Sequence, residues 1–219
     1  MTLARRVAAE AVGTGLLLAT IIGSGIMGER LALGNPALAL LANAIATGAV
    51  LVALILTFGP ISGAHFNPLV SLSEALWKRL EWRAVPFYVL AQFIAAFAGV
   101  AAAHLMFDQA LFSASTHARA GLPLVWSEAV ATFGLICIIL GTVQARPAAV
   151  PFAVAGYITA AYWFTASTSF ANPAVTLARA ASETFAGIYA NDAPGFIAGQ
   201  IAGAAGAVVL MKWLLSNKD

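Results

Sequence analysis

Two asparagine–proline pairs, Asn67-Pro68 and Asn172-Pro173, are the residues whose type and placement best suit a chemical role. Asparagine favours the position that caps a helix, and proline favours the first helical turn, where a missing N–H leaves nothing unpaired. While its oxygen caps a helix, an asparagine amide still offers N–H donors. The pairs therefore indicate hydrogen bonding to a neutral solute that carries lone pairs.

Other reactive groups are few and scattered. The three histidines show no metal-ligand spacing, and the single cysteine, Cys137, excludes an internal disulfide and a cysteine-based metal site. The sequence contains no Ser-His-Asp set and no phosphate-binding glycine loop. We therefore expect no catalytic residue, no metal and no cofactor, and we regard a membrane enzyme as the least favoured class.

Composition indicates a protein of the lipid bilayer. Of 219 residues, 61% are hydrophobic and 9% are charged, whereas a soluble domain carries about 25% charged residues. A net charge of +2 is too small for a nucleic-acid footprint. Long apolar segments, each approaching the ~20 residues that cross a ~30 Å hydrocarbon core, occupy residues 7–28, 37–58, 84–107, 122–144, 148–166 and 193–216. The first is expected to be a retained span and not a cleaved signal peptide, because its apolar character continues past Ile26.

Two shorter apolar segments, residues 67–77 and 172–182, each begin at an asparagine–proline pair. A helix of this length reaches about 16 Å, which is roughly half of the hydrocarbon core. We therefore expect two half-length helices that enter the membrane without crossing it.

An internal repeat relates the two halves of the chain. AAEAVGT at 8–14 matches WSEAVAT at 126–132, FNP at 66–68 matches ANP at 171–173, and Gln92 matches Gln200. Each half contains three spans, an odd number, so the second half must be inverted relative to the first. We predict a single all-α domain over residues 1–219, with six transmembrane helices and two re-entrant half-helices in inverted repeats at about 1–115 and 120–219.

The basic residues predict the orientation, because cytoplasmic loops carry an excess of Lys and Arg. With six spans and both termini in the cytoplasm, eight basic residues lie inside, namely Arg5, Arg6, Lys78, Arg79, Arg83, Arg146, Lys212 and Lys218, and three lie outside, namely Arg30, Arg119 and Arg179. Aromatic residues such as Tyr162 and Trp163 are expected to mark span ends or packing contacts.

The inverted half-helices are expected to meet near the middle of the bilayer. Each helix N-terminus carries about half a positive charge and free N–H groups, so a cation there meets a repulsive field. Backbone exposed before each short helix must line a cavity. This arrangement favours a passive channel for neutral solutes. An ion-coupled transporter is the alternative, although only Asn67 and Asn172 stand where a transporter would place ionisable groups.

SGAHFNP at 62–68 and NPA at 172–174, with the paired Glu10 and Glu128, resemble the major intrinsic protein family of aquaporins and aquaglyceroporins over the whole chain. The resemblance implies six tilted spans, two re-entrant half-helices, one pore per subunit and a homotetramer. It assigns the two pore motifs to Asn67, Pro68 and Leu69 and to Asn172, Pro173 and Ala174, where Leu69 departs from the family pattern.

In this family an arginine usually follows the second motif, but Val175 occupies that position here. The resemblance places the selectivity filter at Thr47, Ala160, Ser169 and Val175, which include no arginine, histidine or aromatic ring. Such a filter is wide and partly apolar, so solutes larger than water should pass. The chain further resembles bacterial aquaglyceroporins linked to arsenic resistance, which implies the bacterial inner membrane and neutral arsenite, with methylated arsenicals, glycerol and water as further solutes. A water-selective aquaporin is the alternative.

Four ionisable residues each have two interpretations. Glu10 and Glu128 lie within spans, where they either carry ions or, as the resemblance implies, accept hydrogen bonds from the loops before the half-helices. His65 either gates the pore by protonation or makes an orienting hydrogen bond. Arg179, one turn beyond the filter position of the second half-helix, either offers a positive charge in the outer vestibule or pairs with Glu183 or lipid headgroups.

Overall fold

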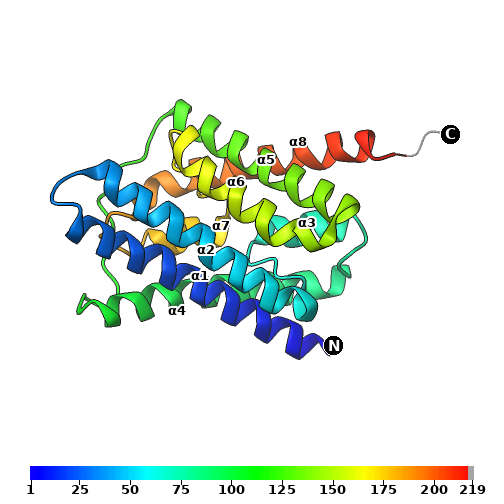
Figure 1. Cartoon of the computed structure of the whole chain (residues 1–219), viewed down its shortest axis with the longest axis horizontal. Helices are drawn as coiled ribbons and strands as arrows, with labels where there is room; N and C mark the ends of the chain where they lie inside the picture. The colour runs from blue at the N-terminus through cyan, green and yellow to red at the C-terminus, as the bar shows by residue number, and fades with distance from the viewer. Residues whose placement is uncertain (217–219) are drawn as a thin grey trace.

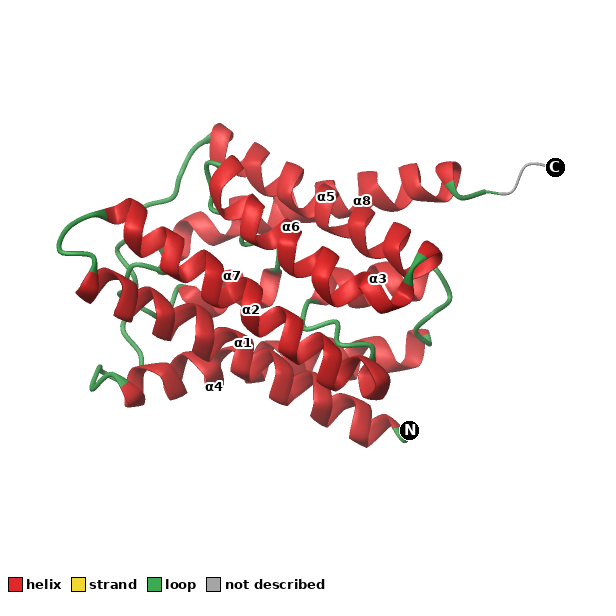
Figure 2. Cartoon of the chain, in the orientation of Figure 1, coloured by secondary structure: helices red, strands yellow, loops and turns green. Residues whose placement is uncertain are grey.

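The chain folds as a bundle of helices. The structure, a computed structural model, describes residues 1–216, and within them it contains helices and loops but no strand (Figure 2). The long helices are α1 (Leu3–Leu31), α2 (Pro36–Ser62), α4 (Val85–Met106), α5 (Leu122–Ala145), α6 (Val150–Phe164) and α8 (Ala193–Leu214), and the short helices are α3 (Pro68–Leu76) and α7 (Pro173–Arg179). The predicted all-α class is confirmed.

Proline and asparagine mark where these helices begin. Proline lies in the first turn of each α-helix from α2 to α8, where its fixed φ suits the helix and its missing N–H has no intrahelical partner to lose. Asn35, Asn67 and Asn172 cap α2, α3 and α7 by accepting hydrogen bonds from backbone N–H groups of the first turn. The local sequence therefore fixes the start of both short helices.

Five of the long helices are long and apolar enough to cross a bilayer. The exception is α6, whose 15 residues reach about 22 Å. A 3-10 turn at Pro147–Ala149 precedes α6, and Thr165 after it has extended backbone. The predicted span at 148–166 is therefore helical over a shorter range than expected.

The two halves repeat the same order of elements, with two long helices, a short helix and a third long helix. In the first half α1 packs against α2 and α4, and in the second half α5 packs against α6 and α8. The halves meet where α2 packs against α6 (Figure 1). Glycines permit the closest contacts, since a Cβ on Gly99 would collide with the backbone of Gly15, and a Cβ on Gly203 would collide with that of Ala129.

The beginning of α1 and the end of α8 lie at one end of the bundle, on the right of Figure 1. We name this the terminal end and the opposite one the distal end. From the middle of the bundle, α3 extends towards the terminal end and α7 towards the distal end (Figure 1). Of the basic residues, Arg5, Arg6, Lys78, Arg79, Arg83, Arg146 and Lys212 belong to the terminal end, and Arg30, Arg119 and Arg179 to the distal end, whereas Lys218 lies outside the described residues.

Both short helices end earlier than predicted, since α3 has nine residues and α7 has seven. The loop over residues 107–121 accounts for the early end of α7. Ser115 donates its backbone N–H to the carbonyl of Ala180 at 3.0 Å, and Ser113 donates to that of Ala181 at 3.1 Å. These carbonyl groups are therefore satisfied without a further helical turn.

Candidate pore

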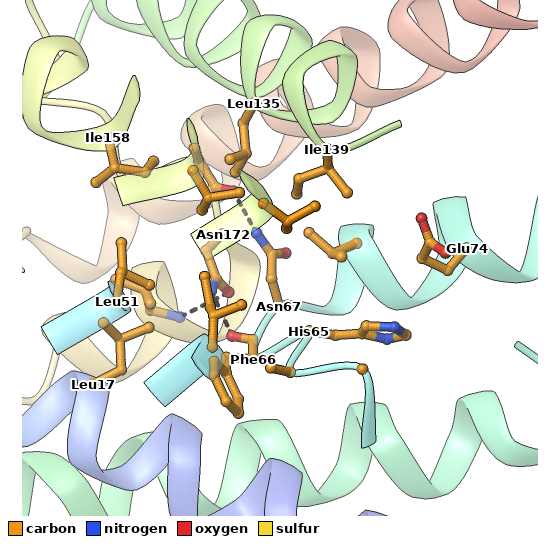
Figure 3. A pocket seen from close by; sticks show the side chains of 18 of the residues that line it. Leu17, Leu51, His65, Phe66, Asn67, Glu74, Leu135, Ile139, Ile158 and Asn172 are labelled. Carbon is orange, nitrogen blue, oxygen red and sulfur yellow. Dashed lines mark hydrogen bonds between the residues drawn. The ribbon is translucent and has the colours of Figure 1, made fainter. Parts of the chain in front are cut away.

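The N-termini of α3 and α7 meet through their capping asparagines (Figure 3). Each Oδ1 accepts a hydrogen bond from the N–H two residues further on, at 2.9 Å for Asn67 and 3.0 Å for Asn172. The amide nitrogens cross over, because Asn67 Nδ2 donates to the carbonyl of Ala171 and Asn172 Nδ2 to that of Phe66, both at 2.8 Å. Each asparagine thus fixes its own helix to the chain entering the other. The other motif residues are buried in the first turns of the short helices, namely Pro68, Leu69, Pro173 and Ala174.

Glu10 on α1 and Glu128 on α5 hold the loops that lead into the short helices. Glu10 accepts hydrogen bonds from the N–H groups of the two residues before the α3 cap, at 2.9 and 2.7 Å. Glu128 accepts from the equivalent N–H groups before the α7 cap, both at 2.8 Å. Gln92 and Gln200 each add a side-chain bond, at 2.9 and 2.6 Å. Both carboxylates are fully buried and neither lines the cavity, so their oxygens serve the fold.

The two loops repeat an unusual backbone conformation. Ala64 and Phe66 have φ angles of 53° and 51°, and the equivalent residues Ser169 and Ala171 have 52° and 47°. Left-handed conformations are uncommon in residues other than glycine and persist only where the surroundings hold them. The loop carbonyls are left outside any helix, and at membrane depth such groups are tolerated only where they line a cavity.

A cavity of about 390 Å³ lies along both loops and both asparagines (Figure 3). Its lining extends from Arg6 and Arg79 near the terminal end to Arg179 near the distal end. The loops, over residues 62–67 and 169–172, form one wall with backbone and amide groups. The facing wall is apolar and comes from α1, α2, α5 and α6, through Leu17, Ile21, Leu51, Ile55, Leu135, Ile139, Val143, Val150, Val154 and Ile158. A solute in the cavity therefore meets hydrogen-bonding groups on one side and methyl groups on the other.

Charged and polar side chains line the terminal part of the cavity. His65 places Nδ1 3.0 Å from the hydroxyl of Ser71, so its ring is oriented by a hydrogen bond. Glu74 and Arg79 form an ion pair at 3.5 Å. Arg6 lines the same part and donates from Nε to a tyrosine hydroxyl of α4 at 2.9 Å. Solutes entering from this end therefore pass one neutralised ion pair, Glu74 with Arg79, and the charge of Arg6, which has no ion-pair partner in the part of the chain that the structure describes.

Three of the four predicted filter residues, Thr47, Ser169 and Val175, line the cavity between the asparagines and the distal end. Ala160 does not line it, because its side chain is exposed on the outside of α6. Tyr162 takes its place, with 3% of its surface exposed and its hydroxyl 3.2 Å from Thr47 Oγ1. The assignment of Ala160 is therefore wrong, since two residues along a helix point to nearly opposite faces. The cavity wall beside Thr47 therefore contains an aromatic ring, which the predicted filter lacked.

A spacing of four would have identified Tyr162. The cavity-lining residues of α6 are Val150, Val154, Ile158 and Tyr162, and those of α2 are Thr47, Leu51, Ile55 and its last residue, Ser62. Residues four apart share one face of a helix. The expectation that Tyr162 marks a span end or a packing contact did not include this pattern.

Arg179 closes α7 and lines the distal part of the cavity, although only 2% of its surface is exposed. Its Nε donates to the carbonyl of Ala186, and its Cζ lies 3.4 Å from the centroid of the Phe170 ring. It does not pair with Glu183, which accepts hydrogen bonds from the backbone N–H and the hydroxyl of Thr116. The predicted pairing is wrong, and these bonds instead hold the pKa of the Glu183 carboxyl below its usual range.

Two half-helices that meet N-terminus to N-terminus beside a cavity, inside a bundle of apolar spans, define a pore-forming membrane protein. The profile of the major intrinsic protein family matches residues 1–150. Over 214 residues the chain is 56% identical to Aquaglyceroporin AqpS of Rhizobium meliloti (strain 1021), which covers 97% of this chain and 91% of the relative. It is 32% identical over 195 residues to Aquaporin NIP2-2 of Zea mays, covering 85% of this chain and 65% of the relative.

Among solved structures, the aquaglyceroporin from Plasmodium falciparum has the same fold, with a TM-score of 0.72 at 20% sequence identity over 97% of this chain and 95% of that chain. The chain belongs to the major intrinsic protein family. The resemblance inferred from the asparagine motifs is thereby confirmed, and with it the class of passive membrane channel for small solutes.

Proposed function

We propose that this protein conducts small uncharged solutes larger than water, with glycerol and neutral trivalent arsenite as the principal candidates. The observation that carries the proposal is that Thr47, Tyr162, Ser169 and Val175 line the cavity with hydroxyl groups, methyl groups and one aromatic ring but no charge. We infer that these four residues form the distal constriction. Residues without charge select neither for a charged solute nor for a strongly hydrated one. The name of the AqpS relative, an aquaglyceroporin, supports glycerol as one such solute.

The two walls of the cavity explain how a neutral solute can pass through it. Each asparagine uses one amide N–H to bind a loop carbonyl, so its second N–H is available to a solute oxygen. Loop carbonyls accept from solute hydroxyl groups, while the apolar wall contacts the remaining surface of the solute. The facing helix N-termini hold positive potential at the centre of the cavity and oppose cations.

The membrane setting is part of the proposal. We place the terminal end in the cytoplasm of a bacterium, since seven described basic residues belong to that end and three to the distal end. Apolar side chains exposed on the long helices, such as Leu90 at 59% and Ile94 at 63%, suit contact with lipid or with neighbouring subunits of a homotetramer. Each subunit is one domain of inverted repeats at 1–115 and 120–219, and methylated arsenicals and water pass by the same route.

Stopped-flow light scattering on proteoliposomes tests the solute class. Liposomes that contain the protein are expected to admit glycerol and arsenite faster than protein-free liposomes, and their water permeability is expected to rise as well. Vesicles that gain water permeability but exclude glycerol would instead identify a water-selective aquaporin.

A further inference from the structure

Arg179 carries a charge whose role the uncharged constriction does not explain. It is a cation held within a membrane-spanning bundle, and such residues are costly and mark solute or ion pathways by default. Among residues 1–216, the ion pairs are Arg79 with Glu74 and Arg83 with Glu81, so no described carboxylate neutralises it. A buried charge is usually paired with an opposite charge, so an unpaired one calls for an explanation.

The guanidinium of Arg179 is fixed in place and only partly satisfied. Its Nε donates to the carbonyl of Ala186, and its Cζ lies 3.4 Å from the centroid of the Phe170 ring. Within the described chain, its two terminal nitrogens make no hydrogen bond to protein. Since Arg179 lines the cavity, these nitrogens supply donors to the lumen at a set position.

The position of the charge follows from the helix. Val175 and Arg179 are four residues apart on α7, so they share a face and are separated by about 6 Å along the axis. Val175 lines the cavity with Thr47 and Tyr162, while Arg179 lies one turn nearer the distal end. A solute entering from the distal side therefore meets the charge before it meets the narrow ring.

We propose that Arg179 is a specificity-determining residue of this channel, which excludes cations at the distal mouth and donates hydrogen bonds to the oxygens of an entering neutral solute. The inference rests on the proposed function and adds a second selective level to it. Size is set at the ring around Val175, and charge is set one helical turn further out. In this chain the two selections are separated in space, so each can be changed without the other.

Arg119 provides a matched control. Its Cζ also lies over the Phe170 ring, at 5.2 Å, but its donors are used on loop carbonyls, with Nε 2.8 Å from that of Gly187, and it does not line the cavity. If the charge at the distal mouth merely stabilised the loops, loss of either arginine would have similar effects on ion leakage.

The experiment compares Arg179→Gln with Arg119→Gln in proteoliposomes, using potassium and proton leakage under an imposed membrane potential together with glycerol permeability. The glutamine side chain keeps a donor for the Ala186 carbonyl but removes the charge. We expect Arg179→Gln to raise cation leakage at least about tenfold, with glycerol still conducted, and Arg119→Gln to stay at the unmodified level. The double variant Val175→Arg with Arg179→Gln is expected to restore cation exclusion and to reduce glycerol permeability.

Cation leakage of inserted Arg179→Gln equal to that of the unmodified protein would overturn the inference, as would equal leakage in both single variants. If Arg179→Gln does not insert, Arg179→Met, whose apolar side chain needs no partner, takes its place in the comparison, and Arg179→Lys is expected to remain tight to cations. Absence of glycerol flux in the unmodified protein would contradict the proposed function, while the cation comparison would still decide the role of Arg179.

Discussion

At the scale of single residues, the proposed solute class depends on Val175, which lines the cavity beside the hydrogen-bonded pair of Thr47 and Tyr162. Val175→Arg places a long side chain in this ring. We expect glycerol permeability to fall by about tenfold or more, as one misfitting group typically costs in a selective site, while water permeability falls much less. Stopped-flow scattering measures both, with Val175→Ala as a control that keeps glycerol flux. Unchanged glycerol and arsenite uptake by an inserted Val175→Arg protein would refute the assignment.

Tyr162 and Ala160 offer a direct comparison of the two faces of α6. Tyr162→Ala removes a buried ring from the cavity wall and is expected to raise glycerol permeability relative to water. Ala160→Leu enlarges a side chain that is exposed outside the cavity, so both permeabilities are expected to stay unchanged. If Ala160→Leu changed glycerol permeability and Tyr162→Ala did not, Ala160 and not Tyr162 would be the filter residue of α6.

The sequence predicted three of these cavity-lining positions correctly and one wrongly. Ser169 and Val175 each lie three residues from the asparagine cap of α7, so counting along the chain placed them at the cavity. Thr47 and the fifth span are each separated from a cap by a loop with left-handed residues, so the rotation of both helices depends on packing, and counting succeeded only for Thr47. Counting therefore selected Ala160 when the spacing of four indicated Tyr162.

At the scale of elements, the two short helices depend on asparagines that each cap one helix and bind the other. Asn172→Asp keeps the capping oxygen but replaces the donor to the Phe66 carbonyl with a carboxylate oxygen at the centre of the pore. We expect reduced glycerol flux or new cation conductance, measured in proteoliposomes and planar bilayers. Asn35→Asp, which changes the cap of α2 away from the cavity, serves as the control. Wild-type permeability and conductance in Asn172→Asp would count against a pore at this asparagine.

Replacing either buried glutamate is expected to lower the stability of the fold, because each glutamate holds the loop before a short helix. In Glu128→Gln one carboxylate oxygen becomes an NH2 group facing backbone donors, which leaves at least one N–H unsatisfied. An unsatisfied buried donor costs about 2 kcal/mol, and Glu10→Gln is expected to behave alike because its contacts are equivalent. Thermal unfolding in detergent measures the loss, with Glu29→Gln at an exposed site as the control. Unfolding temperatures equal to the unmodified protein would show that the carboxylates do not hold the loops.

Helix starts were predictable because asparagine and proline act locally, whereas the end of α7 was not. Residues 180–182 continue the apolar pattern of the short helix, but the loop over 107–121 binds the carbonyls of Ala180 and Ala181. That loop carries no periodicity that would reveal its partner. The position of Arg179 is set by the Ala186 carbonyl and the Phe170 ring, and no sequence pattern links these residues to it.

At the scale of the whole molecule, the inverted repeat makes the pore a joint product of both halves. α3 and its loop line the terminal part, and α7 and its loop line the distal part, while Glu10 and Glu128 stay bound behind the loops. The asparagines at the centre carry no titratable group. Since an ion-coupled transporter uses ionisable groups near its midplane site, this arrangement favours passive flux down the gradient of the solute alone.

The central claim is therefore tested most directly by measuring glycerol entry into proteoliposomes with and without imposed proton and sodium gradients. We expect entry faster than in protein-free liposomes, at a rate that is the same with either gradient, with its reversal or with none, and net accumulation that stops when glycerol is equal on both sides. Entry that requires an ion gradient, accumulation beyond equality, or entry no faster than in protein-free liposomes would contradict the account.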